Sequence, residues 1–431
     1  MNILMITNVF TPQIGGVTRS VQQFCHEFRN QGHCVLVIAP EYDRSPTDEH
    51  DVIRVPAIPN FYQNQYPLPL PAFSTLIPEI RGFSPDIVHV HHPFLLGSTG
   101  QLIAADRNVP LVYTHHTRYS VYIETKTDWP RSIEEGILEL IIGFCELCDG
   151  IVAPSVGIQD LLRQRGITTR MQVIPTGVDL KRFAHAQPGA LRQRLSLPEE
   201  TWIVGHVGRL APEKNTLFLA RAVAAFLKEH AQSEFVVVGD GPDRDSMEDI
   251  LQQEGVGDRS HFMGFLEGAE LVDAYAAFDV FAFASHSETQ GMVLSEAMAA
   301  GVPVVGVDAT GVRDLIVDGV NGRLIPRDDI PDFVNALTSI ASTGKSESEC
   351  WRQGALNSAA EVSLSVSAAR MIDFYSELIR HPQRTPLNDW ERLQQRWEAR
   401  WQLWRNRARA MAAAARETFH QENESRSTPG H

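Results

Sequence analysis

Short apolar segments alternate with helical segments along the first half of the chain. The runs NILMIT (2–7) and CVLVIAP (34–40) are separated by an amphipathic stretch from about Val17 to Asn30. Similar runs follow as DIVHVHH (86–92), PLVYTHH (110–116) and DGIVAPS (149–155). Strands with few polar positions are buried on both faces, and helical stretches between them are typical of βα units. This half therefore predicts a parallel sheet covered by helices.

The second half repeats the pattern, with apolar runs at 201–209, 234–241, 280–285 and 302–308. Because 431 residues exceed what one hydrophobic core usually organises, we expect two doubly wound α/β domains joined near residues 174–183. Ligands of such sheets bind at the carboxyl ends of the strands. Two facing domains would therefore share a ligand-binding cleft.

We expect an N-terminal domain at residues 1–182, a second domain at 183–365, and a crossover helix at 366–384 that returns to the first domain. The segment 58–73 (IPNFYQNQYPLPLPAF) is rich in aromatic residues and proline, and we expect a loop there. Two interpretations stay open: the loop lines the entrance for an acceptor, or it is a packed Ω-loop.

The tail at 385–431 differs from the rest of the chain. Between residues 390 and 416 it has seven arginines and two acids, although the whole chain carries a net charge of −15. Its apolar residues follow one helical stripe, made of Trp390, Leu393, Trp397, Trp401, Trp404 and Met411. A basic amphipathic helix with tryptophan on its apolar face suits an anionic membrane surface. The alternative is that this face docks on the protein itself or in an oligomer.

Composition narrows the class of protein. An apolar fraction of 43% is typical of a globular protein, and the acidic balance argues against a general nucleic-acid binder. Five scattered cysteines indicate reduced thiols in the cytoplasm, and Cys145-x-x-Cys148 is interpreted as helix packing rather than redox or metal chemistry. No apolar run reaches the ~18 residues of a membrane span. The start of the chain is typical of a strand and not of a signal peptide.

Three features point to a bound diphosphate. Gly15-Gly16 ends the loop after the first strand and opens a helix, where backbone amides can approach an anion closely. Arg209 and Lys214 follow another strand end, and each charged hydrogen bond to a phosphate would contribute ~1.5–3 kcal/mol. A helix that starts near Met292 would direct its positive end toward the same anion.

Two glutamates complete this pattern. Glu288 is expected at a loop tip, and Glu296 is expected about one turn into the helix that starts near Met292. In an uninterrupted helix the two would lie roughly 80° apart. A loop before the helix instead lets Glu288 approach the ligand that the helix faces. The combination suits a ligand with hydroxyls at some points and negative charge at others.

Two other clusters resemble metal sites. Asp243 and Asp245 follow a Gly-Pro turn, where acids also suit the first turn of a helix, and we favour that interpretation. His91, His92, His115 and His116 follow two strands. For His115 we favour a hydrogen-bonding role at a strand end, and His116 is the functional candidate. No metal ion and no cofactor are expected.

Longer segments around these residues carry a resemblance. They are GRLAPEKN, VVGDGPDRD, FMGFLEGAELVDAYAAFDVFAFAS and SETQGMVLSEAMAAGVPVVGVDATGVRDLIVDGVNGRL, with GGVTRSV and HVHHPFLLGSTG…PLVYTHHT earlier in the chain. The first four resemble the nucleotide-sugar half of retaining glycosyltransferases of family 4, and the earlier ones resemble the acceptor half. The resemblance covers about residues 1–380 and implies the GT-B fold, in which two Rossmann-like domains face a cleft.

The resemblance also implies residue roles. Glu296 would accept hydrogen bonds from ribose hydroxyls, and Glu288 would face the transferred sugar. Arg209 and Lys214 would neutralise the diphosphate leaving group.

Further roles follow from the same match. The loop of Gly15 and Gly16 would come close to the phosphates, and His116 would lie beside the anomeric centre. The remaining donor contacts would come largely from backbone groups, at Gly264 and Phe265 beside the base and at Thr289, Gln290, Gly291, Met292 and Val293 beside the sugar and phosphates.

The acceptor is implied by HHPFLLG, THHTRYSVYIE and SETQG, which resemble the subgroup that glucosylates diacylglycerol. This implies a metal-independent, retaining transfer from UDP-glucose to a membrane lipid by an enzyme on the inner face of the membrane. No nucleophilic carboxylate stands out, so we favour front-face displacement over a covalent intermediate. The pattern TRYSVYIE departs from the subgroup, which leaves the role of Glu124 open.

Alternatives remain at this point. The residues do not separate uridine from guanosine, or glucose from mannose and galactose, and phosphatidylinositol mannosyltransferases form a second subgroup. The acceptor could also be a sugar phosphate or a growing polysaccharide. A remote alternative is a non-catalytic membrane-associated protein that binds nucleotide sugars. The oligomeric state stays open.

Overall fold

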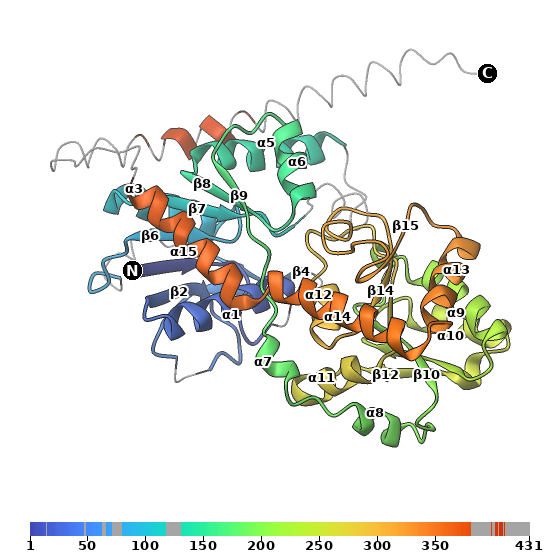
Figure 1. Cartoon of the computed structure of the whole chain (residues 1–431). Coiled ribbons are helices and arrows are strands. Elements are labelled where there is room, and N and C mark those ends of the chain that lie inside the picture. Colours follow the sequence, from blue (N-terminus) through green and yellow to red (C-terminus); the bar gives the residue numbers. More distant parts are fainter. Residues whose placement is uncertain are drawn as a thin grey trace, which may run out of the picture. The chain divides into compact units, whose positions relative to one another are not determined.

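The computed structural model describes residues 1–13, 15–46, 49–62, 66–70, 80–117, 131–380, 398, 401–403, 405–407 and 409. The chain forms two compact units, one of Met1–Ile174 with Ala368–His431, and one of Pro175–Ser367. The units meet at residues 174/175 and 367/368, whereas the sequence analysis expected boundaries at 182/183 and 365/366. Each unit contains its own parallel sheet with helices on both faces (Figure 1).

The first unit has a seven-stranded parallel sheet in the order β3-β2-β1-β6-β7-β8-β9. Its strands are β1 (Asn2–Ile6), β2 (Cys34–Pro40), β3 (Val52–Val55), β6 (Ile87–Val90), β7 (Leu111–Thr114), β8 (Gly150–Ala153) and β9 (Met171–Val173). Its helices are α1 (Gly16–Asn30), α3 (Leu96–Arg107), α5 (Arg131–Leu147), α6 (Val156–Gln164) and α15 (Leu364–Arg380). The strands expected from the apolar runs and the helix expected at 17–30 are confirmed.

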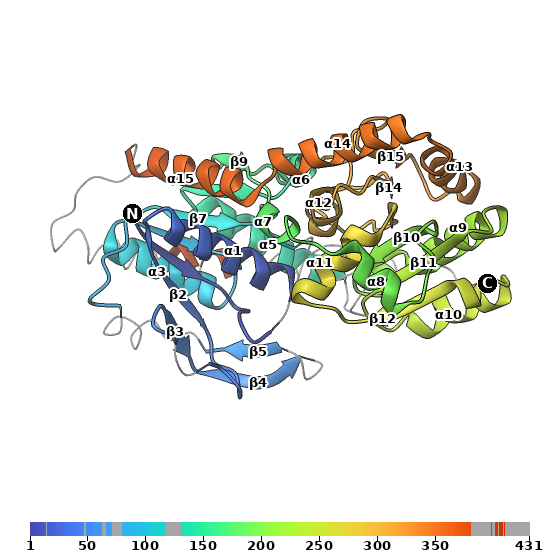
Figure 2. The ribbon, with the colours of Figure 1, turned by 60° about the horizontal axis from the view of Figure 1, so that its bottom comes forward.

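Both faces of this sheet are buried, which explains why its strands lack polar alternation. Ile3 and Met5 point into a core shared with α1 and α15, whereas Leu4 and Ile6 point into a core shared with α3 and α5. Helix α15 comes late in the sequence, yet it packs on the first sheet (Figures 1 and 2). Gly150 lies under α15, where an added Cβ would come within 2.6 Å of the Phe374 ring.

The expectation of a loop at residues 58–73 was wrong for its described part. Strands β4 (Ala57–Tyr62) and β5 (Tyr66–Pro69) form a two-stranded antiparallel sheet that follows β3 in the chain (Figure 2). Proline cannot donate to a ladder, and it is tolerated only where a strand has an open edge. Both strands of a two-stranded sheet have such an edge, so the prolines that suggested a loop are compatible with strands here.

The second unit has a six-stranded parallel sheet in the order β12-β11-β10-β13-β14-β15. Its strands are β10 (Trp202–Val207), β11 (Ser233–Val238), β12 (Ser260–Gly264), β13 (Val280–Phe283), β14 (Val304–Val307) and β15 (Gly322–Ile325). Its α-helices are α7 (Leu180–Phe183), α8 (Pro188–Arg194), α9 (Thr216–Glu229), α10 (Arg244–Gln253), α11 (Gly268–Ala277), α12 (Met292–Ala299), α13 (Ile330–Ala341) and α14 (Lys345–Glu361), with short 3-10 helices η1 (Pro212–Lys214) and η2 (Gly257–Arg259). The second doubly wound sheet is therefore also confirmed.

The described residues of the tail are helical and contact α5 of the same unit. Asn406 is buried and donates its side-chain Nδ2 to the carbonyl of Leu140 at 3.0 Å. Gly143 makes room for it, since an added Cβ would lie 1.8 Å from Asn406 Oδ1. Arg409 adds an exposed ion pair with Glu146 at 3.7 Å. One face of the tail helix thus docks on the protein itself.

Candidate active site

The sequence candidates of the second unit gather where its parallel strands end. The segment after β10 carries Arg209 and Lys214, and the segment after β13 carries Glu288. Strands β10 and β13 are hydrogen-bonded neighbours, so their carboxyl ends lie at the same edge of the sheet. This adjacency explains how residues 74 positions apart in sequence meet.

Lys214 and Glu288 form a direct ion pair, with Nζ and Oε1 2.5 Å apart. Ser287 holds the loop of Glu288 against η1, because it donates its hydroxyl to the carbonyl of Glu213 at 3.0 Å. Arg209 is exposed, and within the described residues it forms no hydrogen bond or ion pair. The site therefore offers one cation that is engaged by a carboxylate and one that faces solvent.

The surroundings of Glu288 favour its ionised form. Burial alone would raise the pKa of Glu288, but the charge and hydrogen bond of Lys214 and a hydrogen bond from Ser285 outweigh burial and lower the pKa below its usual value. Glu288 is thus a carboxylate at neutral pH. The negative charge of Glu288 is paired with Lys214. A bound phosphate group would attract Lys214 and could replace Glu288 as its partner.

Helix α12 begins at Met292, as expected, and its Gly291 cap has φ 74° and ψ 56°. This left-handed conformation favours glycine, and an added Cβ would also meet the Leu294 side chain at 2.9 Å. Gly291 provides no side chain to cap the helix, so the first N–H groups of α12 have no side-chain cap. Met292 and Val293 are half-buried at this helix start.

Glu296 lies in the second turn of α12 and is 5% exposed. The hydroxyl of Tyr275, from the neighbouring helix α11, donates to Glu296 Oε2 at 2.8 Å. Tyr275 is itself fully buried in the core of this unit. A buried tyrosine therefore fixes the side chain of the second glutamate.

Gln290 is held by a reciprocal pair of hydrogen bonds. Its Nε2 donates to the carbonyl of Thr176, and its Oε1 accepts from the N–H of Thr176, both at 2.6 Å. The Gln290 side chain is thus engaged by the protein, and half-buried Thr289 precedes it in the loop. Gly311 passes so close to this loop that an added Cβ would lie 2.8 Å from the backbone nitrogen of Gln290.

The end of β12 carries the residues expected beside a nucleotide base. Gly264 has φ +68°, and its carbonyl accepts a hydrogen bond from the Gly239 N–H at 2.7 Å. Phe265 follows with 59% of its surface exposed. A large aromatic side chain this exposed at a strand end is available for contact with a planar ligand.

Three site candidates belong to the first unit. Gly15 and Gly16 lie at the start of α1, with nothing within 4 Å of an added Cβ on either. His116 lies just after β7 and is described below with its partners. The structure describes these residues within the first unit and the others within the second.

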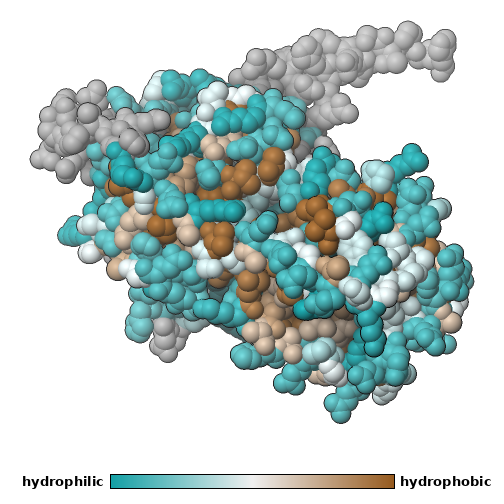
Figure 3. All heavy atoms as spheres, viewed as in Figure 1, coloured by the Kyte–Doolittle hydropathy of each residue, from teal (hydrophilic) through white to brown (hydrophobic). Residues whose placement is uncertain are grey.

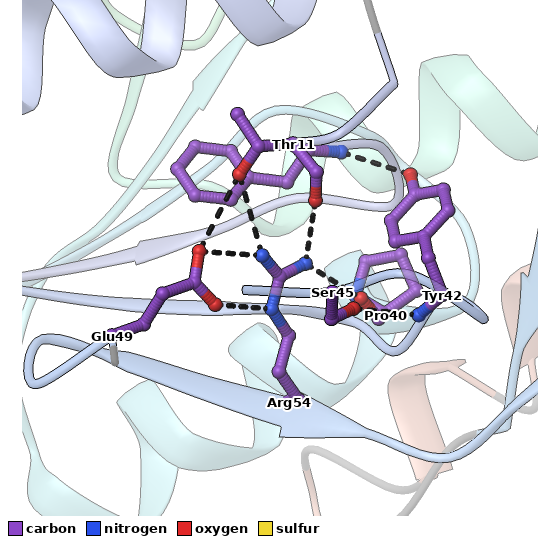
Figure 4. Close-up of polar contacts among 7 residues, drawn as sticks. Thr11, Pro40, Tyr42, Ser45, Glu49 and Arg54 are labelled. Carbon is purple, nitrogen blue, oxygen red and sulfur yellow. Dashed lines mark hydrogen bonds and ion pairs between the residues drawn. The ribbon is translucent and has the colours of Figure 1, made fainter. Parts of the chain in front are cut away.

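Arg54 anchors the start of the loop that leads to Gly15 (Figure 4). Its guanidinium makes a bidentate pair with Glu49 at 2.7 Å and donates to the carbonyls of Thr11 and Pro40 at 2.9 Å. The rings of Phe10 and Tyr42 lie 5.6 and 5.9 Å from it. A bidentate guanidinium with both carbonyls is a rigid link between the loops after β1 and β2.

The strand-end histidines bond to the protein. His91 Nδ1 lies 2.8 Å from His116 Nε2, the N–H of Asn8 donates to His92 Nδ1 at 3.1 Å, and Tyr113 bonds His115 at 3.2 Å. Burial, followed by the charges of neighbouring histidines, lowers the pKa of His116 well below 6.5. His116 is therefore neutral at physiological pH.

Asp243 also has a structural partner. Thr216, at the start of α9, donates its hydroxyl to Asp243 Oδ2 at 2.5 Å, and Asp245 lies in the first turn of α10. The described residues contain no group of three His, Cys, Asp or Glu side chains placed to hold a metal ion. Cys145 is fully buried, and burial raises its pKa to about 12, which agrees with a packing role.

Of the four tryptophans in the apolar stripe of the tail, the structure describes Trp401 alone. Trp401 is 57% exposed, whereas Trp390, Trp397 and Trp404 lie outside the described residues, as does Glu124. Trp401 and Asn406 are five positions apart, so they point about 140° apart around the helix. Trp401 therefore does not share the face that docks on α5. None of the described helices combines the length and apolar character that a bilayer crossing needs.

Sequence reasoning missed Tyr275, Thr176, His91 and the Arg54–Glu49 pair. Each of them acts through a contact that only the folded chain creates, between residues with no shared motif. A signal existed only for His91, which belongs to the cluster of strand-end histidines.

Comparisons with known proteins agree with this arrangement. The model of Glycosyltransferase Family 4 matches residues 14–182, and that of Glycosyl transferases group 1 matches residues 189–356. A GDP-mannose-dependent alpha-mannosyltransferase of Mycobacterium tuberculosis is 34% identical over 344 residues, which cover 76% of this chain and 84% of that protein. An alpha-monoglucosyldiacylglycerol synthase of Streptococcus pneumoniae is 29% identical over 330 residues, which cover 75% of each.

Solved structures agree at the level of the fold. Sucrose-phosphate synthase from Thermosynechococcus elongatus matches with a TM-score of 0.71 at 21% identity, over 88% of this chain and all of that chain. Anabaena HepE in complex with UDP matches with a TM-score of 0.68 at 22% identity, with the same coverage. Two Rossmann-like units with parallel sheets and these matches define a glycosyltransferase with the GT-B fold. The chain belongs to glycosyltransferase family 4.

Proposed function

We propose that this enzyme transfers glucose, with retention of configuration and without a metal ion, from UDP-glucose to diacylglycerol or a similar membrane lipid. The observation that carries the proposal is the Lys214–Glu288 pair, with exposed Arg209 in the same segment after β10, at the strand ends of the second unit. The relatives from Streptococcus pneumoniae and Acholeplasma laidlawii that are named alpha-monoglucosyldiacylglycerol synthases support the acceptor.

The positive groups suit the leaving diphosphate. As the bond between the sugar and the phosphate breaks, negative charge grows on the phosphate oxygen. Arg209, Lys214 and the start of α12, all in the second unit, would stabilise that charge without reorganising, which is how fixed dipoles and cations accelerate a reaction. These groups provide the positive charge that a divalent cation would otherwise supply.

The glutamates suit the rest of the donor. Glu296, fixed by Tyr275, would accept hydrogen bonds from the ribose, and Glu288 would face the sugar. Glu288 already bonds Lys214 and Ser285, which reduces its strength as a nucleophile. We therefore favour front-face displacement. In this step the acceptor oxygen bonds the anomeric carbon as the phosphate oxygen leaves, and the acceptor proton passes to that phosphate oxygen.

A second candidate donor is GDP-mannose. The relative at 34% identity is named for this donor, and a Mycolicibacterium smegmatis relative with the same name is also 34% identical over 352 residues. The residues assigned to the diphosphate and the ribose would serve either donor, because UDP-glucose and GDP-mannose share these two parts and differ only in the base and the hexose.

The tail supports a membrane acceptor. Trp401 is exposed, and the described neighbours Arg405, Arg407 and Arg409 are exposed as well. An anionic leaflet attracts each basic residue near it by ~1 kcal/mol. We therefore place the enzyme on the cytoplasmic face of a membrane, bound peripherally.

The direct test is a transfer assay. Purified protein is incubated with diacylglycerol vesicles and labelled UDP-glucose, UDP-galactose, GDP-mannose or GDP-glucose, with and without EDTA. The expected product is a glucolipid with an α linkage, seen by mass spectrometry and NMR, at an EDTA-insensitive rate. A mannolipid would favour the second donor. Transfer only to soluble sugars, loss of activity with EDTA, or a glycosylated Glu288 peptide would each contradict its part of the proposal.

A further inference from the structure

His91 and His116 form a histidine pair at the strand ends of the first unit. His91 follows β6 and His116 lies two residues after β7, and these strands are hydrogen-bonded neighbours. His91 Nδ1 and His116 Nε2 are 2.8 Å apart, and the two rings stack with centroids 5.1 Å apart. A single hydrogen bond therefore links one nitrogen of each ring.

The direction of that hydrogen bond follows from the other nitrogen of His91. A neutral imidazole has one N–H and one bare nitrogen. His91 is 1% exposed, and its Nε2 is buried without a hydrogen-bond partner among the described residues. If Nδ1 accepted the bond, the proton of His91 would sit on this partnerless Nε2. Buried N–H groups without an acceptor are rarer in proteins than buried acceptors without a donor. The proton of His91 therefore belongs on Nδ1.

A second histidine holds His91 in this orientation. The ring of His89 lies 4.4 Å from that of His91, and both of its nitrogens are bonded, Nδ1 to the hydroxyl of Tyr375 and Nε2 to that of Thr114. Tyr375 belongs to α15, and all of its surface is buried. The crossover helix thus supports the histidine pair through a fixed ring.

We propose that His91 is a positioning residue that donates its Nδ1–H to Nε2 of His116, which leaves the His116 proton on Nδ1. The basic nitrogen of His116 is then occupied by the protein. His116 consequently acts on the sugar as a neutral hydrogen-bond donor and does not accept the proton of the acceptor hydroxyl. This second statement rests on the proposed function, whereas the direction of the hydrogen bond does not. Burial of both rings, which lowers the pKa of each well below 6.5, supports two neutral side chains.

The hydrogen bond is tested without any substrate. Long-range 1H–15N correlation spectra of full-length protein with 15N-labelled histidine report which nitrogen carries each proton, and His116→Asn and His91→Phe variants assign the signals. The expected spectrum shows His116 with a protonated Nδ1 and a bare, hydrogen-bonded Nε2. A protonated His116 Nε2 would overturn the proposal, whether or not the enzyme proves to be a lipid glucosyltransferase.

The role in catalysis is tested by two substitutions at one position. His91→Phe keeps a ring but removes the donor, so we expect kcat to fall about tenfold, the effect of one hydrogen bond. His91→Asn places an amide nitrogen near the position of Nδ1, and we expect it to restore most of kcat. Equal losses in two variants that fold with wild-type melting temperatures would contradict a positioning role.

The pH profile gives a third measurement. In His91→Phe the basic nitrogen of His116 is released, so the pKa of His116 should rise from its wild-type value while burial still holds it below 6.5, and protonation of His116 should produce a new loss of kcat below pH 6.5. The wild-type enzyme should show no such loss in this range. Tyr113→Phe is the matched control, because it removes a buried hydroxyl that bonds the neighbouring His115 and leaves all the histidines in place. The same new loss in the control, or its absence from His91→Phe, would count against the proposal.

Discussion

At the scale of single residues, the site depends on side chains that hold other side chains. Glu288 is held by Lys214, and Glu296 is held by Tyr275. The two pairs differ in kind, since one is a charge pair at a loop and the other is a hydroxyl bond between two helices of the core. They therefore predict different effects of substitution.

Tyr275→Phe removes the hydroxyl that orients Glu296. A hydrogen bond to a charged group contributes about 1.5–3 kcal/mol, so we expect KM for the donor to rise roughly tenfold with a smaller change in kcat. Steady-state kinetics with varied donor measures this. Tyr113→Phe, which removes a buried hydroxyl that bonds His115, is the control and should leave donor KM unchanged. A fall in kcat alone would argue against ribose binding by Glu296.

Glu288→Gln tests the ion pair through the pH dependence of stability. The pKa of Glu288 in the folded protein lies below the ordinary 4.5, so its pairing stabilises the fold above pH 4.5 and is lost as the pH falls through the lower folded value. We expect the melting temperature of the variant to lie below that of the wild type at pH 6, with the difference shrinking below pH 4.5. A difference that stays constant down to pH 3 would show that the pair does not contribute in this way.

At the scale of elements, α5 is shaped to receive the tail helix. Gly143 leaves the space that Asn406 fills, and Asn406 bonds the carbonyl of Leu140. Alanine normally stabilises a helix by about 1 kcal/mol relative to glycine. At position 143, however, the alanine side chain would collide with Asn406. The substitution should therefore stabilise α5 itself and weaken the docking of the tail helix on it.

Gly143→Ala should therefore release the tail while leaving α5 helical. We expect faster hydrogen exchange in peptides that cover residues 401–409, with unchanged exchange in the sheet of the first unit. Gly189→Ala is a matched control, because Gly189 also lies in a helix but has open space around its Cβ position. Equal protection of the tail in both variants would contradict the docking seen here.

At the scale of the whole molecule, an acidic chain carries a cluster of seven arginines between residues 390 and 416, which predicts salt-dependent membrane binding. Full-length protein should cosediment with vesicles that contain anionic lipid and dissociate as salt is raised. Deletion of residues 385–431 should remove most of this binding, whereas neutral vesicles should bind either form weakly. Undiminished binding after the deletion would mean that the attachment lies elsewhere.

The sequence predicted the order and type of the main elements because strands buried on both faces leave uninterrupted apolar runs. It could not predict the β4–β5 sheet, since proline is informative only when the number of neighbouring strands is known. The sequence also predicted that Glu288 lies in a loop and Glu296 in the following helix, because both belong to the segment SETQGMVLSEAM. Tyr275 stayed hidden because it lies 21 positions before Glu296 and reaches it only once α11 packs beside α12.

The position of α15 has a consequence for biosynthesis. The strands of the first sheet lie within residues 2–173. One apolar face of this sheet is covered by Phe374 and Leu378 of α15, a helix that comes about 200 residues later in the chain. Domains ordinarily fold in the order in which the ribosome releases them. Here an apolar face of the first unit stays exposed to solvent until the second unit and α15 have been translated. Nascent chains that stall in between are therefore natural clients for chaperones.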